Sequence, residues 1–183
     1  MKPRRAAAPS RKRAPDAFPD PHHDHDACVG RALADADAIC ARRGERLTTL
    51  RRRVLELVWG SHQPVGAYAL LERMREHGRS PAPPTVYRAL DFLRAQGLVH
   101  RIESLNAFVG CDSPERPHAV QFMICRGCRT AVELHDEGIA RAIGAAAGAA
   151  GFAVQSRVVE LAGLCRECAA LSDPASGASP APA

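Results

Sequence analysis

The sequence is organised around the stretch His100–Cys128, which reads HRIESLNAFVGCDSPERPHAVQFMICRGC. This stretch, together with a glutamate five residues beyond it, is rich in side chains that bind soft and borderline metal ions. The candidate ligands are His100, Cys111, His118, Cys125, Cys128 and Glu133. The last four residues of the stretch form a Cys-x-x-Cys pair, and a second pair, Cys165 and Cys168, lies near the C-terminus.

Two Cys-x-x-Cys pairs can supply four thiolates to one tetrahedral zinc ion, with Zn–S bonds of about 2.3 Å. The spacing suits this geometry because a tight knuckle directs both sulfur atoms toward one centre. One pair alone is a weak indication of a metal site, whereas two together are a strong one. The remaining His100, Cys111, His118 and Glu133 suit a second site with mixed nitrogen, sulfur and oxygen donors. The sequence therefore predicts two zinc ions per chain.

The composition limits the size of the fold and the class of partner. The chain has 183 residues, of which 46% are hydrophobic, and this is enough for one or two small cores. Its formal net charge of +5 mildly favours a polyanionic partner. Almost all of the basic residues are arginine, which suits contacts with phosphate and guanine.

The cysteines and the N-terminal segment indicate the compartment. Seven cysteines, an odd number, in a chain without a recognisable export signal favour reduced thiols and metal or redox chemistry in the cytosol. The basic N-terminus is followed by Pro15, Asp16 and Pro19, where a signal peptide requires an apolar run. No uncharged apolar stretch reaches membrane length. We expect a cytoplasmic protein.

The N-terminal residues 1–27 are rich in Pro, Ala, Arg and Asp, lack periodicity, and are expected to be disordered. They contain His22, His23 and His25, which could form an auxiliary metal site. We favour a histidine-rich patch in a disordered tail, because a flexible cluster must lose conformational entropy before it can bind a metal.

The segment 28–111 has the pattern of a winged helix-turn-helix domain. Helical periodicity predicts helices over 28–43, 48–60, 67–77 and 84–96, and two short strands over 98–103 and 107–111 form the wing. In the first helix, Cys40 lies on the apolar face and is interpreted as a small buried hydrophobe, whereas Cys28 has no evident role.

The helix over 84–96 is the candidate recognition helix. Val86, Leu90 and Leu93 form its inward stripe, and its outward residues include Thr85, Tyr87 and Arg88. An amphipathic helix with an ordinary charged face is the alternative interpretation.

Beyond this domain, residues 112–118 break the periodicity and are interpreted as a linker. Strands are predicted over 120–124, 130–133 and 153–161, and a helix over 136–151, within a small α/β domain at 119–170. The tail 171–183 is expected to be disordered. The overall expectation is an α+β fold, with an N-terminal winged helix-turn-helix domain followed by this small α/β domain.

The run PPTVYRALDFL at 83–93, the run GLVHRIES at 97–104 and the two Cys-x-x-Cys pairs resemble the Fur family of metal-sensing repressors, and within it the zinc uptake regulators. The resemblance covers roughly residues 30–170 and includes both order and spacing. It implies a dimerisation domain at 119–170 with structural zinc on the paired cysteines Cys125, Cys128, Cys165 and Cys168. It implies a sensing zinc on His100, Cys111, His118 and Glu133.

Two features depart from the family pattern. The usual Thr-Pro-Gln-Arg of the second helix is replaced by Thr48-Thr49-Leu50-Arg51. The His-His-Asp-His run that iron and peroxide sensors carry just before the first cysteine pair is also missing there, and the similar run at 22–25 lies far upstream. With a thiolate in the sensing site, this favours zinc over iron.

The resemblance implies a homodimer that represses zinc-uptake genes when zinc is sufficient, with zinc as corepressor. In a two-fold dimer, the recognition helices must reach successive major grooves about 34 Å apart in a symmetric double-stranded DNA operator. Tyr87 could contact a thymine methyl group and Arg88 a guanine or phosphate, with Thr85 beside them. Arg46 and Arg51 are expected to contact the DNA backbone or minor groove.

An enzyme is the competing class. A catalytic zinc keeps an open position, usually with three protein ligands, so four ligands favour a closed regulatory site and we predict no enzymatic activity. The alternatives that remain are an iron- or peroxide-sensing repressor, a cytosolic zinc enzyme and a thiol-redox protein.

Overall fold

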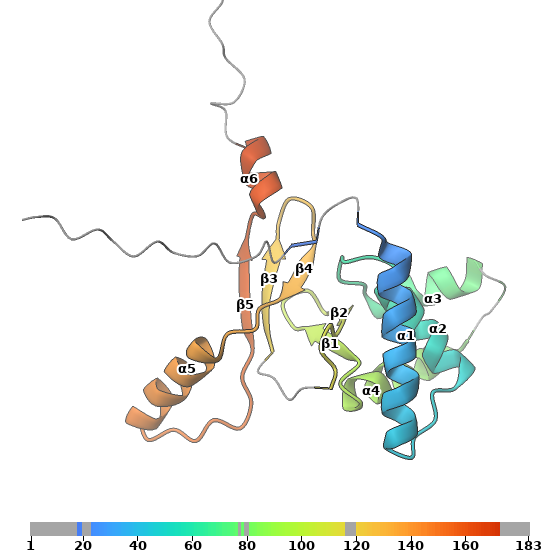
Figure 1. Cartoon of the computed structure of the whole chain (residues 1–183), viewed down its shortest axis with the longest axis horizontal. Coiled ribbons are helices and arrows are strands. Elements are labelled where there is room, and N and C mark those ends of the chain that lie inside the picture. The colour runs from blue at the N-terminus through green and yellow to red at the C-terminus, as the bar shows by residue number, and fades with distance from the viewer. Residues whose placement is uncertain (1–17, 20–22, 77, 79–80, 116–119, 173–183) are drawn as a thin grey trace, which may run out of the picture.

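The computed structural model describes residues 18–19, 23–76, 78, 81–115 and 120–172. A helical N-terminal part is followed by a smaller part built around a sheet, as Figure 1 shows, which confirms the expected α+β class. The helices are α1 (His25–Arg42), α2 (Thr49–Trp59), α3 (Ala67–Glu76), α4 (Pro83–Ala95), α5 (Glu137–Ala149) and α6 (Arg166–Ser172). The strands are β1 (Val99–Ile102), β2 (Ala107–Gly110), β3 (Gln121–Cys125), β4 (Ala131–Glu133) and β5 (Val159–Gly163). None of the helices in the described residues is long and apolar enough to cross a membrane.

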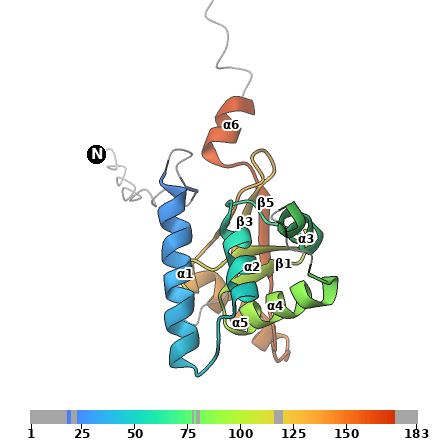
Figure 2. The same ribbon diagram turned by 90° about the vertical axis from the view of Figure 1, so that its right-hand side faces the viewer.

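Helix α2 lies at the centre of the N-terminal core, between α1 and α4 in Figure 2 and in contact with α3 and β2. Its buried residues include Val54, Leu55 and Val58, each no more than 1% exposed. Complete burial of one such aliphatic side chain contributes about 1.5–3 kcal/mol. Helix α1 adds Cys40, which is buried as predicted.

Helix α4 has the orientation that its sequence predicts. Two prolines stand in its first turn, where no backbone donor is lost, and the chain leaves it at Gly97 with a φ of 68°. Val86, Leu90 and Leu93 are buried in the N-terminal core. The opposite face of the helix is therefore free to meet a partner.

The hairpin of β1 and β2 forms the predicted wing and packs on both sides. The strands pair antiparallel, from Val99 opposite Gly110 to Ile102 opposite Ala107. Phe108 belongs to the N-terminal core and forms a bridge with Val65, which precedes α3. A Cβ at Gly110 would lie 2.1 Å from an atom of the Trp59 ring, so only glycine allows this close approach.

The other face of the hairpin belongs to a second hydrophobic core. Ile102 and Val109 pack with Phe122, Ile124 and Ala131 of the C-terminal sheet. This sheet has the strand order β4-β3-β5, with β4 antiparallel and β5 parallel to β3. The wing and the sheet are also joined through the Glu160 carboxylate on β5, whose Oε1 accepts from the backbone N–H of Glu103 at 2.7 Å.

The outer part of the C-terminal region leaves much apolar surface exposed. Helix α5 contains no buried residue, and Figure 1 shows it projecting beside β5 without a layer over it. The exposed large apolar side chains in this region are Phe152, Val154, Val158, Leu161, Leu164 and Leu171. A patch of this kind usually marks a protein–protein contact.

The structure corrects two limits of the expected disordered tails. Helix α1 begins at His25 rather than Cys28, because the Asp24 carboxylate accepts a hydrogen bond from Ala27 N at 3.1 Å and caps the helix. Residues 25–27 are therefore helical. At the other end, α6 was not predicted and continues to Ser172, past the expected limit at 170.

The start of the last strand is also corrected. Strand β5 begins at Val159, not at 153, and ends at Gly163. Its partner β3 begins at Gln121, which pairs with Val159, so β3 offers no hydrogen-bonding edge to residues 153–158. The apolar alternation of those residues was therefore misleading.

Candidate metal centres and nucleic-acid interface

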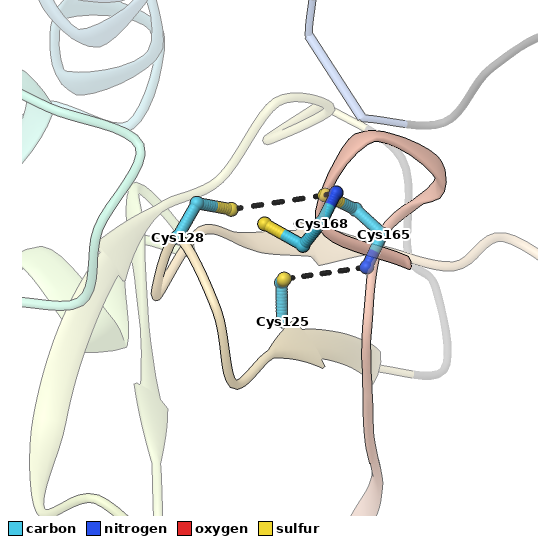
Figure 3. Close-up of side chains that lie close together, drawn as sticks. All are labelled: Cys125, Cys128, Cys165 and Cys168. Atoms are coloured by element: carbon cyan, nitrogen blue, oxygen red, sulfur yellow. Dashed lines mark hydrogen bonds between the residues drawn. The ribbon is translucent and has the colours of Figure 1, made fainter. Parts of the chain in front are cut away.

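The four paired cysteines come together at one end of the C-terminal sheet. Cys125 ends β3, Cys128 lies in the following turn, Cys165 follows β5 and Cys168 lies in α6, as Figure 3 shows. Their sulfur atoms all lie within 4.8 Å of one another. The Cys128–Cys165 separation is 3.9 Å, and tetrahedral zinc with bonds of about 2.3 Å requires sulfur atoms about 3.8 Å apart. The cluster therefore fits one zinc ion.

Backbone N–H groups stabilise the thiolate form of one cysteine in this cluster. Cys165 N donates to Cys125 Sγ at 3.2 Å. Burial raises the pKa of Cys125, but backbone donors, first among them Cys165 and Cys128, outweigh burial and lower the pKa to about 6. Hydrogen bonds shared with the other thiols raise the pKa of Cys168 to about 12. Cys125 is thus ready to ionise, whereas the Cys168 thiol needs a nearby cation before it loses its proton.

The knuckle of the first pair depends on a glycine. A Cβ at Gly127 would lie 2.7 Å from Cys168 Sγ, so any larger residue would push the two pairs apart. All seven cysteines are free thiols. Four thiol ligands leave no open position on a tetrahedral ion, which is the arrangement of a structural site.

The second predicted cluster spans the two parts of the fold. His100 lies on β1, Cys111 directly follows β2, and Glu133 ends β4. One ligand atom from each lies within 4.8 Å of the others, and His100 Nε2 is 3.3 Å from Glu133 Oε1. The structure therefore brings together these three predicted ligands, whereas His118 lies outside the described residues.

Burial makes this second cluster costly without a cation. The side chains of Glu133 and His100 are 4% and 15% exposed. Burial, followed by the charge of Asp112, raises the pKa of Glu133 to about 8. Burial and then the charge of Glu133 raise the pKa of the Cys111 thiol. A divalent cation would offset both penalties, so the donor set fits zinc with mixed ligands.

Two neighbours of this cluster were missed by the sequence analysis. His135 Nε2 lies 3.1 Å from Asp112 Oδ1 and 3.6 Å from Glu133 Oε2. Together the three form a further group that could hold a metal ion. The available signal was adjacency, because Asp112 follows Cys111 and His135 lies two residues after Glu133.

Three of the predicted DNA-contacting residues lie on α4, and the other two lie in the first turn of α2 and in the segment before it. Thr85, Tyr87 and Arg88 are exposed, with Tyr87 at 41%. Arg46 is also exposed.

Arg51 is half-buried and already has two contacts inside the protein. Its guanidinium lies 3.4 Å from the centroid of the Phe92 ring, and Nη1 donates to Arg46 O at 2.7 Å. Arg51 therefore attaches the Arg46 segment to α4. A DNA contact from Arg51 remains a prediction.

The comparison with family models decides the classification. The ferric uptake regulator family matches residues 42–162, which include the wing, α4 and the first cysteine pair. The chain belongs to this family. The match ends before the second cysteine pair, but the geometry of the sheet brings that pair to the first.

Within this family, the similar proteins described next are zinc uptake regulators. The zinc uptake regulation protein of Escherichia coli (strain K12) is 42% identical over 137 residues, which cover 74% of this chain and 80% of that protein. A zinc uptake regulator in complex with zinc and DNA has a TM-score of 0.73 at 40% identity and covers 78% of this chain and 96% of its own. Holo XcZur has a TM-score of 0.69 at 47% identity, covering 75% of this chain and 96% of its own.

We expect Cys168→Ser to remove one zinc ion per chain and to unfold the C-terminal sheet region. Structural zinc contributes about 10–16 kcal/mol of apparent binding free energy in zinc-finger peptides, and this energy is coupled to folding. Zinc analysis by mass spectrometry together with thermal unfolding would measure both effects. Cys28→Ser is the matched control, since Cys28 lies outside every described ligand group. A Cys168→Ser protein with full zinc content and normal stability would contradict the assignment.

We expect the zinc at the His100, Cys111 and Glu133 cluster to be released on acidification. Since the pKa values of Cys111 and Glu133 are raised, both carry protons that zinc must displace. At pH values below the Glu133 pKa of about 8, the zinc affinity of this cluster should therefore decrease as the pH decreases, by about tenfold per pH unit for each proton displaced. Competition with a chromophoric chelator at several pH values would measure this, and a pH-independent affinity would refute it.

Proposed function

We propose that this chain is a zinc-responsive, DNA-binding transcriptional repressor of zinc-uptake genes, with zinc as corepressor. The observation that carries the proposal is the donor set of His100, Cys111 and Glu133, which joins the wing to the C-terminal sheet. The 42% identity with a zinc uptake regulation protein and the likeness to a zinc uptake regulator bound to zinc and DNA support it. We further propose two zinc ions per chain, one at the four cysteines and one at this donor set, with His118 as its fourth ligand.

The donor set provides a physical link between metal and DNA. Glu133 and Cys111 would lose their protons to bind zinc there, and the cation would offset the negative charges that they then carry. His100 belongs to the wing and Glu133 to the sheet, so the angle between the two parts becomes fixed. Without a cation, the buried carboxylate and thiol destabilise this arrangement. Zinc binding would thus shift the equilibrium toward the conformation in which the wing packs against the sheet.

A homodimer supplies the symmetry that an operator needs. The exposed apolar residues around β5 and α5, among them Phe152 and Leu161, form the surface that a second copy would cover. Two copies of α4 can then enter major grooves one helical turn apart, about 34 Å. The angle between wing and sheet determines whether this separation is met.

The exposed face of α4 would read the operator. We assign Tyr87 to a thymine methyl group, and Arg88 to a guanine edge or a phosphate. Thr85, at the start of the helix, and the exposed Arg46 would contact the DNA backbone, and Arg51 would hold Arg46 in place. The net charge of +5 favours this association.

The thiol of Cys111 distinguishes zinc from iron as the regulating metal. A sulfur donor beside an imidazole and a carboxylate suits a tetrahedral zinc site, whereas iron sensors use harder donor sets. A zinc enzyme would require an open coordination position and a positioned general base. The four proposed ligands leave no such position.

The zinc dependence of operator binding tests the proposal directly. We expect zinc to raise the affinity of the wild-type dimer for its operator, and Cys111→Ser to reduce the affinity in zinc to the chelated level, a loss of at least about 1–3 kcal/mol. Gel-shift titrations with and without a chelator that removes only the weaker zinc would measure it. Cys28→Ser should behave like the wild type. Equal affinity of wild type and Cys111→Ser, with no effect of zinc on either, would overturn the repressor–corepressor mechanism.

The recognition helix is tested by Arg88→Ala. This change should weaken operator binding by about 1–3 kcal/mol if Arg88 makes a base contact, and it should leave zinc content and dimerisation unchanged. Arg94→Ala is the matched control, because Arg94 is an exposed arginine in the last turn of the same helix. If the two variants bind DNA equally well at fixed salt concentration, α4 does not read bases through Arg88.

A further inference from the structure

Three histidines from distant parts of the sequence meet beside the start of α1. His23 and His25 flank the capping residue Asp24, and His62 lies in the turn between α2 and α3. Their ring centroids are 4.8 to 5.5 Å apart, and His23 Nε2 is 2.9 Å from His62 Nε2. One ring nitrogen from each lies within 4.8 Å of the others. All three side chains are half-buried.

The cluster holds more buried nitrogen than hydrogen bonds can satisfy. Both ring nitrogens of His25 are buried, and neither has a hydrogen-bond partner among the described residues. A buried polar atom left without a partner costs about 1–3 kcal/mol. Burial, followed by the nearby His25 and His23, lowers the pKa of His62, so this imidazole is neutral at neutral pH. Neutral imidazoles are the form that binds metal ions.

We propose that His23, His25 and His62 form a third metal site, which takes a borderline divalent transition-metal ion such as Zn²⁺. Imidazole nitrogen suits zinc, copper and nickel, and discriminates against calcium and magnesium. Tetrahedral zinc with Zn–N bonds of about 2.0–2.1 Å needs nitrogen atoms about 3.3 Å apart, so the present 2.9 Å contact requires only a small adjustment. Three histidines leave the fourth position to water or another ligand.

The sequence analysis favoured a histidine-rich patch without a metal role, and the geometry argues for the alternative. His62 was not considered, since 37 positions separate it from His25. The entropy cost that weighed against the site is also smaller than expected, because His25 is already held in the first turn of α1. His22 lies outside the described residues and is not needed for the site.

The turn that carries His62 lies at the junction between the N-terminal helices and the C-terminal sheet. Ala131 N donates to His62 O at 3.1 Å, and Gln63 Nε2 donates to Cys128 O at 2.9 Å. The turn that carries His62 therefore contacts both the C-terminal sheet and the knuckle of the four-cysteine cluster. A metal ion on the three histidines would tie the start of α1 to this junction.

An ion can reach the cluster from solvent. A cavity of about 660 Å³ is lined by His23, His62, Gln63 and Cys128. The same cavity also borders the four-cysteine cluster. The two clusters differ in ligand type, because one offers thiols and the other offers imidazoles. The proposal does not depend on the repressor function, since it rests on this geometry alone.

Zinc stoichiometry of the full-length dimer tests the site by difference. Protein is equilibrated with excess Zn²⁺, passed through a desalting column, and analysed for zinc and protein content. We expect His62→Gln, and the double variant His23→Ala with His25→Ala, each to hold one zinc ion per chain fewer than the wild type. Ser61→Ala, a change in the same turn, is the control and should match the wild type.

Calorimetric titration separates loss of the site from loss of the fold. The weakest binding event of the wild type should be absent or weakened in His62→Gln by more than the roughly 10–100-fold that loss of a supporting group causes, with circular dichroism unchanged. Equal zinc content and equal isotherms for wild type and both histidine variants would overturn the proposal. Operator binding by His62→Gln should remain zinc-dependent, so failure of the repressor function would be seen separately.

Discussion

The wing hairpin β1–β2 packs against both parts of the structure, and the arrangement of the molecule depends on this double contact. Phe108 and Val99 belong to the helical core, whereas Ile102 and Val109 belong to the core of the C-terminal sheet. The two cores are thus joined through a single two-stranded element, with alternate side chains facing opposite ways. The mixed-ligand cluster, here called the mixed cluster, comprises His100 on this hairpin, Cys111 directly after it and Glu133 at the edge of the adjoining sheet.

The two clusters on the sheet are therefore suited to different physical roles. The four-cysteine cluster joins the ends of β3 and β5 within one part of the fold, and backbone donors already stabilise a thiolate there. The mixed cluster joins two parts, and burial there favours protonated ligands. The first arrangement suits permanent occupation, and the second suits binding that responds to the concentration of free zinc. The proposed histidine cluster adds a third connection, between the start of α1 and the α2–α3 turn.

The features that depend on residues close together in the sequence could be predicted from it. The prolines and Gly97 gave the limits of α4, and the apolar stripe of Val86, Leu90 and Leu93 gave its orientation. The Cys-x-x-Cys spacing gave each cysteine pair, because a knuckle brings its two sulfurs together locally, whereas the meeting of the two pairs depends on the parallel pairing of β3 and β5.

Features that depend on distant partners could not be predicted in this way. The start of β5 is determined by where β3 begins, and the alternating residues before Val159 gave no sign of it. The role of His62 depends on a turn packing beside the start of α1, to which no spacing rule applies. Asp112 and His135 lie close to predicted ligands in the sequence, but their contact with each other exists only once the wing lies against the sheet.

The central claim is that zinc at the mixed cluster and DNA at α4 stabilise the same conformation. Thermodynamic linkage then requires the operator to tighten zinc by the same factor by which zinc tightens the operator, typically about 5–150-fold. The most direct measurement is the affinity of this zinc, obtained by chelator competition at fixed pH and salt, with and without saturating operator DNA. The account predicts tighter binding with DNA, by the factor found in the gel-shift titrations. An identical zinc affinity in both conditions would contradict it.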